Sequence, residues 1–419
     1  MMLLQKHQSS VFISYGKRET IIFIVVSSYC LHMLRNISEV YALVPIALAM
    51  IGFLLYFKKN LSDKFGLIVI ASYVVIYLFP IVYSFIWYPD ESYTIPALRY
   101  LYLIPFLLFS TVVLNRLKFL KAVLITYALF IIFGGLSIYY QMLMGPISWF
   151  AEASERDGLV RFASLTGSLT AYGTYGGLAI PIIYFLFKNK LCMWSASIIV
   201  VTAMLCTLQK AAVVNILLFG SLIFWFASFR KKITVVLQLV VLASALIVLI
   251  YQAENPYLSA TVENVFRVQE GAARSDVSLV DGLIGRMWDL PSKLYEMYGL
   301  TGMLFGVGLV GGSGTLGFPD YPMAHNGIFD LLFIGGVINL LAFVVLWIFV
   351  FLKIRRVELL QAEENDVVMA LLASKIIMVM FLINLFVSGP NFIHPYGGVI
   401  FYSITAFFCM ASPKSILRR

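Results

Sequence analysis

The chain has 419 residues, of which 61% are hydrophobic and 12% charged, with a formal net charge of +9 and a mean hydropathy of +0.92. Soluble domains carry roughly 25% charged residues, so this composition excludes a soluble globular protein. The basic residues fall mainly in short turns between apolar runs, which argues against nucleic-acid binding and calls for a topological explanation.

The apolar runs predict membrane-spanning helices. Such a helix needs roughly 20 mainly apolar residues, because the hydrocarbon core is about 30 Å thick. By this criterion we predict an all-α polytopic bundle of about 12 spans, forming a single integral membrane domain over residues 1–419. The predicted spans are 20–35, 38–57, 65–88, 97–115, 119–143, 170–187, 191–208, 211–229, 233–251, 326–352, 367–388 and 396–412. No small-residue cleavage site separates the first two, so we expect no cleavable signal peptide.

The charges orient these spans. Cytoplasmic loops collect Lys and Arg, and with the N-terminus inside, every inner segment is basic. The inner basic residues are Lys6, Lys17, Arg18, Lys58, Lys59, Lys64, Arg116, Lys118, Lys121, Lys188, Lys190, Arg230, Lys231, Lys232, Lys353, Arg355, Arg356, Lys414, Arg418 and Arg419. The outer segments are acidic or mixed. We therefore predict that both termini are cytoplasmic.

Two predicted outer loops are long, 145–169 and 252–324, the second lying between the ninth and tenth spans. Loops longer than about 12–15 residues usually carry function or disorder. No internal repeat relates the first six spans to the last six, and the position of the larger loop breaks the two-halves plan of many carriers. We therefore expect the large loop to have a catalytic role.

The large loop contains two patterned segments. In GLIGRMWDLPSKLYEMYGL, residues 282–300, apolar residues recur at helical spacing, which predicts an amphipathic helix on the outer face of the membrane. Arg286 lies on this helix. The glycine-dense segment LFGVGLVGGSGTLGF, residues 304–318, follows, and glycine lets backbone amides approach a ligand closely. It is not a P-loop, because no Gly-Lys-Ser/Thr closes it.

Histidines at the outer ends of spans are candidates for acid–base chemistry. His325, followed by Asn326, stands where the large loop meets the tenth span, and Asp330 follows about one turn later, where it either orients His325 or only marks the interface. His394 lies in the last outer turn and could face the same cavity. His32, near the outer end of the first span, has no partner that the sequence suggests. The competing interpretation is that a membrane-boundary histidine is structural.

Three outer cations run against the positive-inside trend: Arg161, Lys210 and Arg286. Cations at the membrane edge are costly and tend to be functional. Together they would suit a ligand that carries phosphates, since Arg offers bidentate donors to phosphate oxygens. The alternative for each is that its side chain reaches to lipid headgroups.

Metal and disulfide chemistry are not indicated. Cys30, Cys192, Cys206 and Cys409 all lie in apolar runs and show no metal-ligand spacing. No Asp-x-Asp occurs in the chain, so we expect neither a metal nor another cofactor.

The segment from Gly285 to Gly336 resembles the signature of the O-antigen polymerase and O-antigen ligase superfamily, polytopic enzymes with a large periplasmic loop late in the chain. The matching residues are Arg286, Gly306, Gly308, His325, Asn326 and Gly336. RFASLTGSLTAYG (161–173) looks like the family's first functional outer loop, with Arg161 in the arginine position. TLQKAAVV (207–214) looks like the place where relatives often have Ser-Arg, but this chain has Gln209 and Lys210.

The resemblance implies transfer of a glycan from an undecaprenyl-diphosphate carrier to an acceptor hydroxyl on the periplasmic side of the bacterial inner membrane. Under this hypothesis, His325 is the general base. Arg286, Arg161 and Lys210 bind the diphosphate. Asn326, Asp330, Gly306, Gly308 and His394 support the site. The expected partners are the carrier-linked oligosaccharide, membrane lipids, and a chain-length regulator and flippase of the same pathway, with no nucleic acid.

Three functions remain open at this point. The favoured one is a polymerase of O-antigen, capsule or exopolysaccharide repeat units. A ligase would use the same donor but attach the polymer to the lipid A core of lipopolysaccharide. A flippase or transporter would be expected to show charges deep in the spans and repeat symmetry, and the sequence shows neither.

Overall fold

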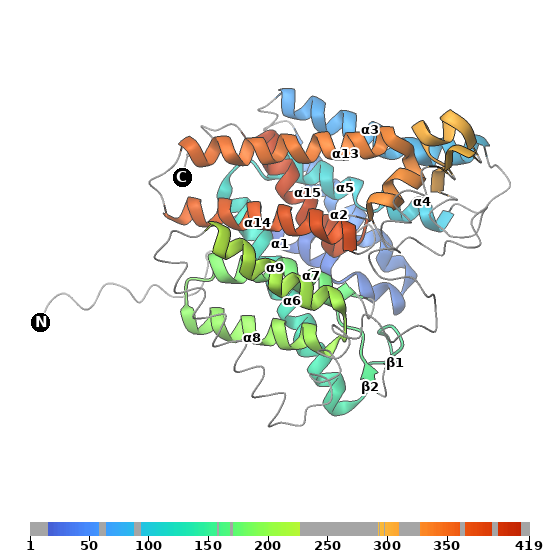
Figure 1. Cartoon of the computed structure of the whole chain (residues 1–419). Coiled ribbons are helices and arrows are strands. Elements are labelled where there is room, and N and C mark those ends of the chain that lie inside the picture. The colour runs from blue at the N-terminus through green and yellow to red at the C-terminus, as the bar shows by residue number, and fades with distance from the viewer. Residues whose placement is uncertain are drawn as a thin grey trace, which may run out of the picture.

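The computed structural model of the chain describes residues 16–57, 64–87, 94–156, 159–167, 171–226, 292, 294–296, 298–309, 327–360, 365–387 and 393–411. These residues form a bundle in which most helices run side by side across the view of Figure 1. Apart from one short hairpin, the regular structure of the described residues is helical, as the all-α prediction requires. Most of the predicted loop 252–324 lies outside the described residues.

The helices fall into three runs along the chain. The first comprises α1 (Lys17–Cys30), the 3-10 helices η1 (His32–Asn36) and η2 (Glu39–Ala42), α2 (Leu43–Tyr56), α3 (Lys64–Trp87), α4 (Thr94–Leu101) and α5 (Ile104–Val113). The second comprises α6 (Leu117–Met144), α7 (Ala171–Leu186), α8 (Lys190–Cys206) and α9 (Lys210–Phe226). The third comprises α13 (Gly327–Leu360), α14 (Asn365–Val387) and α15 (Pro395–Met410).

Five described helical segments are long and apolar enough to cross a membrane: Glu39–Tyr56, Lys64–Ile86, Leu117–Met144, Gly327–Leu359 and Asp366–Phe386. Shorter apolar helices accompany them, including Ala171–Leu186 and Pro395–Met410. This length and composition are those of a membrane protein. The total of 12 spans stays a prediction, and the predicted ninth span, 233–251, lies outside the described residues.

Helix boundaries differ from the predicted spans where proline or a polar contact intervenes. The predicted span 97–115 is two helices, α4 and α5, with Pro105 in the first turn of α5. Proline lacks the N–H that would bond the carbonyl of Leu101, so the helix breaks there. At the other extreme, α13 continues past the predicted end at residue 352 to Leu360, and its last turns place Glu358 beside Lys375 of α14.

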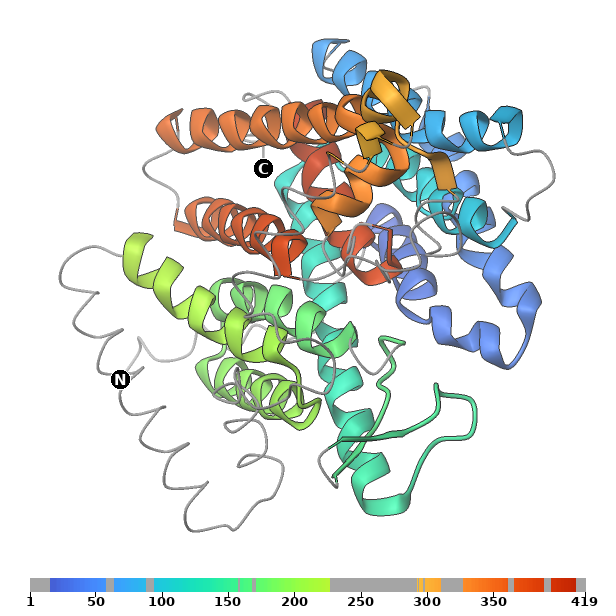
Figure 2. The same ribbon diagram turned by 45° about the vertical axis from the view of Figure 1, so that its right-hand side comes forward.

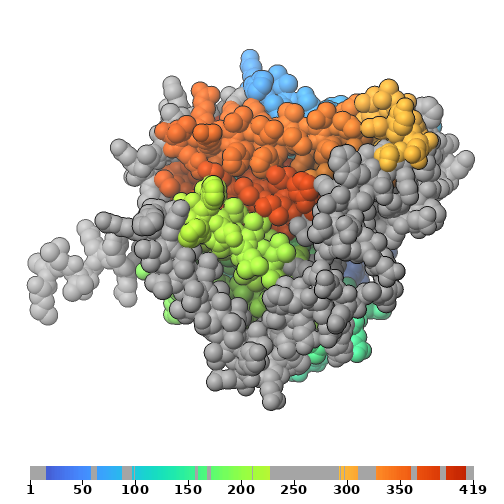
Figure 3. Space-filling view, in the orientation of Figure 1, coloured from blue at the N-terminus to red at the C-terminus, as the bar shows by residue number. Residues whose placement is uncertain are grey.

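The bundle has buried central helices and exposed peripheral ones. In α15 every residue from Tyr396 to Met410 is buried, and in α7 every residue from Ala171 to Ile183 is buried. By contrast, α2 exposes large apolar side chains such as Leu54 and Leu55, as expected for a helix facing lipid. In Figure 3, α9, α14 and α13 lie side by side on one face of the molecule.

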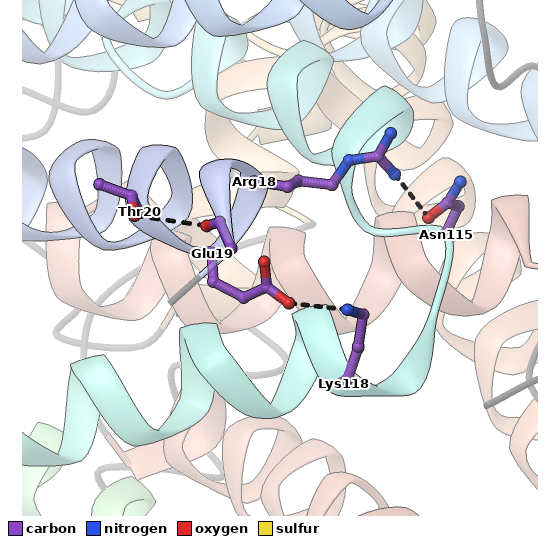
Figure 4. Close-up of polar contacts among 6 residues, drawn as sticks. Arg18, Glu19, Thr20, Asn115 and Lys118 are labelled. Carbon is purple, nitrogen blue, oxygen red and sulfur yellow. Dashed lines mark hydrogen bonds and ion pairs between the residues drawn. The ribbon is translucent and has the colours of Figure 1, made fainter. Parts of the chain in front are cut away.

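Basic helix ends meet at one end of the bundle, which we call the basic end. Figure 4 shows the start of α1 against the start of α6: Arg18 donates to Asn115 Oδ1 at 3.0 Å, and Lys118 Nζ lies 2.8 Å from Glu19 Oε1. The Arg18 guanidinium also covers the Tyr56 ring at the end of α2, 4.6 Å from its centroid.

The same end collects further helix termini. Asp366, at the start of α14, lies 3.3 Å from Lys188 and 3.7 Å from Lys121. Lys375 of α14 bonds Glu358 of α13 at 3.0 Å. These contacts place the starts of α1, α6 and α14 together with the ends of α2, α7 and α13. That this end faces the cytoplasm stays a prediction.

The opposite end, which we call the loop end, carries the connections that the sequence places outside. The strands β1 (Ser154–Arg156) and β2 (Leu159–Arg161) form an antiparallel hairpin in which Ser154 faces Arg161. The hairpin lies beside the last turns of α6 (Figure 2), so part of the predicted loop 145–169 has strand structure that the sequence analysis did not anticipate.

Candidate functional site

A turn at residues 306–309, which we call the glycine turn, packs directly on the start of α13. Gly306, Gly308 and Gly336 have φ angles of 76°, 74° and 66°, a region that glycine adopts without the steric cost met by other residues. A Cβ on Gly306 would lie 2.6 Å from the backbone nitrogens of Gly335 and Gly336, and one on Gly336 would lie 2.2 Å from Leu304 O. The two backbones therefore touch, and α13 is kinked where they do.

Hydrogen bonds fasten the glycine turn on both sides. Val307 N donates to Phe333 O at 2.7 Å, which ties the turn to α13. Leu309 N donates to Ser84 Oγ at 2.7 Å, and Ser84 Oγ donates to Pro80 O, which ties it to α3. A Cβ on Gly308 would lie 2.3 Å from Ser84 Oγ. The turn is thus built into the bundle at a defined position.

The segment before the turn packs on α13 as well. The described residues 294–296 and 298–305 are helical, in the region where an amphipathic helix is predicted. Leu294, on its predicted apolar face, is buried in a cluster with Val307, Phe329, Leu332 and Phe333. At this point the apolar face covers the start of α13 rather than lying open to lipid.

His325, Asn326 and Arg286 lie outside the described residues, so their predicted roles rest on the sequence. The described residue that follows Asn326 in the chain is Gly327, the first of α13. At a rise of 1.5 Å per residue, Gly327 stands about 9 Å along α13 from Phe333, where the glycine turn is bonded. The chain that carries His325 therefore leaves and rejoins the described structure beside the same two turns of α13.

Asp330 projects from the first turn of α13 and is half-buried. It interacts electrostatically with Tyr100 of α4, and the Tyr100 ring stacks on Tyr77 of α3, with centroids 4.9 Å apart. Tyr77 in turn stacks on Tyr73. A carboxylate at the loop end thus borders a buried column of phenol rings, an association that the sequence analysis did not foresee.

Arg161 ends β2, and the loop that follows is bonded along its length. Arg161 Nη2 donates to Ser154 Oγ across the hairpin at 2.7 Å. Gln141 Nε2 of α6 donates to Ala163 O at 2.7 Å. Leu165 N donates to Ser137 Oγ of α6 at 3.2 Å. We call residues 161–167 the arginine loop.

His394 belongs to a cluster of rings on the other side of the arginine loop. It stacks on Tyr175 of α7 with centroids 4.7 Å apart, and it meets His32 of η1 edge-to-face at 5.1 Å. Tyr396 of α15 packs on His32 at 5.8 Å and donates its hydroxyl to Cys30 O at 2.7 Å. The sequence allows His394 to face the same cavity as His325, and the contacts described for it are with these rings and the arginine loop.

The turn between α8 and α9 meets the far end of the segment that begins at Arg161. A Cβ on Gly173 would lie 2.4 Å from Gln209 Oε1, and Asn215 Nδ2 of α9 reaches Gly173 O at 3.5 Å. Leu208 is buried with a φ of 53°, a strained conformation for a bulky residue. Lys210 begins α9, but its side chain is not among those described.

The structure therefore assembles two groups at the loop end. One joins the arginine loop, His394 and the α8–α9 turn, and the other joins the glycine turn, Gly336 and Asp330. α15 belongs to both, because it begins beside His394 and carries Tyr402, which interacts electrostatically with Tyr73 and Tyr77.

Two residues of this end were not selected from the sequence. Ser84, one of many serines in apolar runs, had no signal of its own. For His32 the sequence suggests no partner, because only the fold brings η1 to the start of α15.

No protein-family model matches the chain, and no curated protein matches its sequence.

Proposed function

We propose that this protein transfers a glycan from an undecaprenyl-diphosphate carrier to a sugar hydroxyl, and that it polymerises carrier-linked repeat units of a surface polysaccharide. The proposal takes the loop end as periplasmic and the basic end as cytoplasmic, in a bacterial inner membrane. It rests on the sequence resemblance.

The observation that supports it best is the packing of the motif glycines. Gly306, Gly308 and Gly336 were selected by the motif alone, and each has a positive φ and a neighbouring group where a Cβ would stand. Other glycines of the bundle are also closely packed, but Gly306 and Gly336 are packed on each other, which brings two separate parts of the motif together. Gly306 and Gly336 join the glycine turn to α13, the two described elements between which His325 and Asn326 lie in the sequence.

The chemistry needs a base, an acceptor and a stabilised leaving group. The acceptor oxygen attacks the anomeric carbon of the donor sugar, the bond from that carbon to the diphosphate oxygen breaks, and undecaprenyl diphosphate leaves. His325 takes the proton of the acceptor hydroxyl. Arg161, Arg286 and Lys210 neutralise charge that develops on the diphosphate.

The test is reconstitution of the purified protein in liposomes with carrier-linked repeat units, followed by electrophoresis of the glycan. A ladder of products that persists in EDTA is the expected result, and His325→Ala should abolish it while leaving the protein folded. An intact ladder in His325→Ala would overturn the role of His325. Product that forms only when lipid A core is supplied would show a ligase, and carrier movement without new glycosidic bonds would show a flippase.

A further inference from the structure

The contact between His32 and His394 lies against the arginine loop. Gly167, the last residue of that loop, has a φ of 113°. A Cβ there would lie 2.9 Å from His32 Nε2 and 3.5 Å from His394 Nε2. Both Nε2 atoms therefore face Gly167. The last residue of the arginine loop packs against the two imidazoles and leaves no room for a side chain.

In the part of the chain that the structure describes, the surroundings of the pair are buried and contain little compensating charge. His32 is 4% exposed, and its Nδ1 is buried with no hydrogen-bond partner among the described residues. In the described ranges, the titratable groups that adjoin the pair are Arg35 on η1, Tyr175 on α7 and Tyr396 on α15, and Tyr396 in turn adjoins Cys30 on α1 and Tyr127 on α6. Of these groups, only Arg35 is charged at neutral pH, and its positive charge disfavours a positive charge on either imidazole.

Protonation of the second nitrogen of either imidazole would place a cation in this buried contact, beside the other imidazole and Arg35. Burial and a like charge both disfavour the charged form. The packed arrangement of His32, His394 and Gly167 is therefore that of two neutral imidazoles.

We propose that His32 and His394 are positioning residues: as a neutral pair they hold the arginine loop against η1 and α15, and they thereby fix Arg161 at the loop end. The role of Arg161 in binding a diphosphate rests on the proposed function, but the holding of the loop does not. Acidification is expected to charge the pair and release the loop.

The loop can be followed without any enzymatic assay. Ala163 is fully buried in the arginine loop, so an Ala163→Cys variant reports release through its rate of reaction with a soluble maleimide. Cys192 and Cys206 are replaced by Ser in this background, because they are exposed and partly exposed, whereas the buried Cys30 and Cys409 remain. Rates are corrected for the thiolate fraction at each pH with a free thiol standard.

The corrected rate is expected to rise about tenfold between pH 7.5 and pH 5.5. In His32→Gln and in His394→Gln the rate should already be raised at pH 7.5 and should lose its pH dependence. Because the two histidines act as one unit, the double variant should have about the same labelling rate as each single variant. His7→Asn, which removes a histidine outside the described residues, should keep the response of the parent.

A second pair of variants tests the packing without touching a histidine. Gly167→Ala should release the loop at every pH. Gly145→Ala is the matched control, because Gly145 also has a positive φ, 91°, but nothing lies within 4 Å of an added Cβ. Equal labelling in both would show that backbone strain alone opens the loop, and the proposal would fail.

The proposal would also fail if the parent showed no acid response, or if His32→Gln kept it. These outcomes do not depend on glycan transfer, and the labelling should be unchanged in His325→Ala. In an assay of glycan transfer, acid should raise the KM for the carrier-linked donor in the parent but not in His32→Gln.

Discussion

At the basic end of the bundle, neighbouring helices are joined by long charged side chains, whereas at the loop end they are joined by backbone atoms and rings in direct contact. The ion pairs of the basic end are partly exposed; the side chains of Lys188 and Asp366 are 86% and 59% exposed. At the loop end, Gly306 touches Gly336, and Gly167 touches two imidazoles.

This difference separates two kinds of constraint. An exposed ion pair can be lengthened, shifted or replaced, because its energy depends weakly on geometry and is about 0–1 kcal/mol. A contact between two glycine backbones has no such freedom, because an added atom must displace a helix. We therefore expect the basic end to tolerate substitution and the loop end to resist it.

The largest effect is expected for Gly336→Ala. The added Cβ would lie 2.2 Å from Leu304 O at a φ of 66°, so both strain and a backbone clash oppose it. We expect a destabilisation of at least about 3 kcal/mol and loss of glycan transfer. Gly299→Ala is the matched control, since its φ is 63° and nothing lies within 4 Å of the new Cβ. Thermal unfolding in detergent measures the stability of both variants. Equal losses of stability would show that the contact between Gly336 and Leu304 contributes nothing.

Arg161→Ala comes next and tests the chemistry of the loop end. If Arg161 binds the diphosphate as proposed, its removal should raise the KM for the carrier-linked donor by about 10- to 100-fold, with little change in unfolding temperature. The control is Arg355→Ala, an exposed arginine near the basic end of α13. Donor titrations in liposomes measure both variants. If Arg355→Ala raised the KM as much, the assignment of the loop end as the diphosphate site would be wrong.

Asn215→Leu probes a buried polar contact between α9 and α14, close to the loop end. Asn215 of α9 and Asn384 of α14 are both fully buried and exchange two hydrogen bonds, at 3.1 Å and 2.8 Å. Leaving one amide without its partner should lower the free energy of unfolding by about 1–3 kcal/mol. The Asn215→Leu, Asn384→Leu double variant should cost less than the sum of the two singles. Denaturation of all three measures the coupling, and additive losses would show that the amides act independently.

The helices could be predicted from the sequence because lipid imposes a simple requirement, a run of apolar residues long enough to cross it. Helix α6 and helix α14 meet this requirement, and their predicted bounds are within a few residues of the observed ones. The break between α4 and α5 was missed because the residues around Pro105 are uniformly apolar, and hydropathy does not register a missing N–H.

The candidate site also contains residues that the sequence could predict and residues that it could not. The glycine turn and Arg161 could be selected because a local motif contains them. The pairing of His32 with His394 could not, because it arises where α1 meets α15; the neighbouring bond from Tyr396 to Cys30 joins residues 366 positions apart. The position of Ser84 beneath Leu309 likewise follows from packing of α3 on the glycine turn, which no short pattern encodes.

The smallest effect is expected for Asp366→Asn at the basic end. Asp366 faces both Lys121 and Lys188, yet its side chain is 59% exposed, so water and salt screen both attractions. The loss should be below about 0.5 kcal/mol and should vanish at high salt. Unfolding at low and high ionic strength measures it, with transfer activity unchanged. A loss as large as that of Asn215→Leu would mean that the ion pairs of the basic end are as tightly specified as the buried amide pair near the loop end, and the contrast between the two ends of the bundle would then lie in chemistry alone.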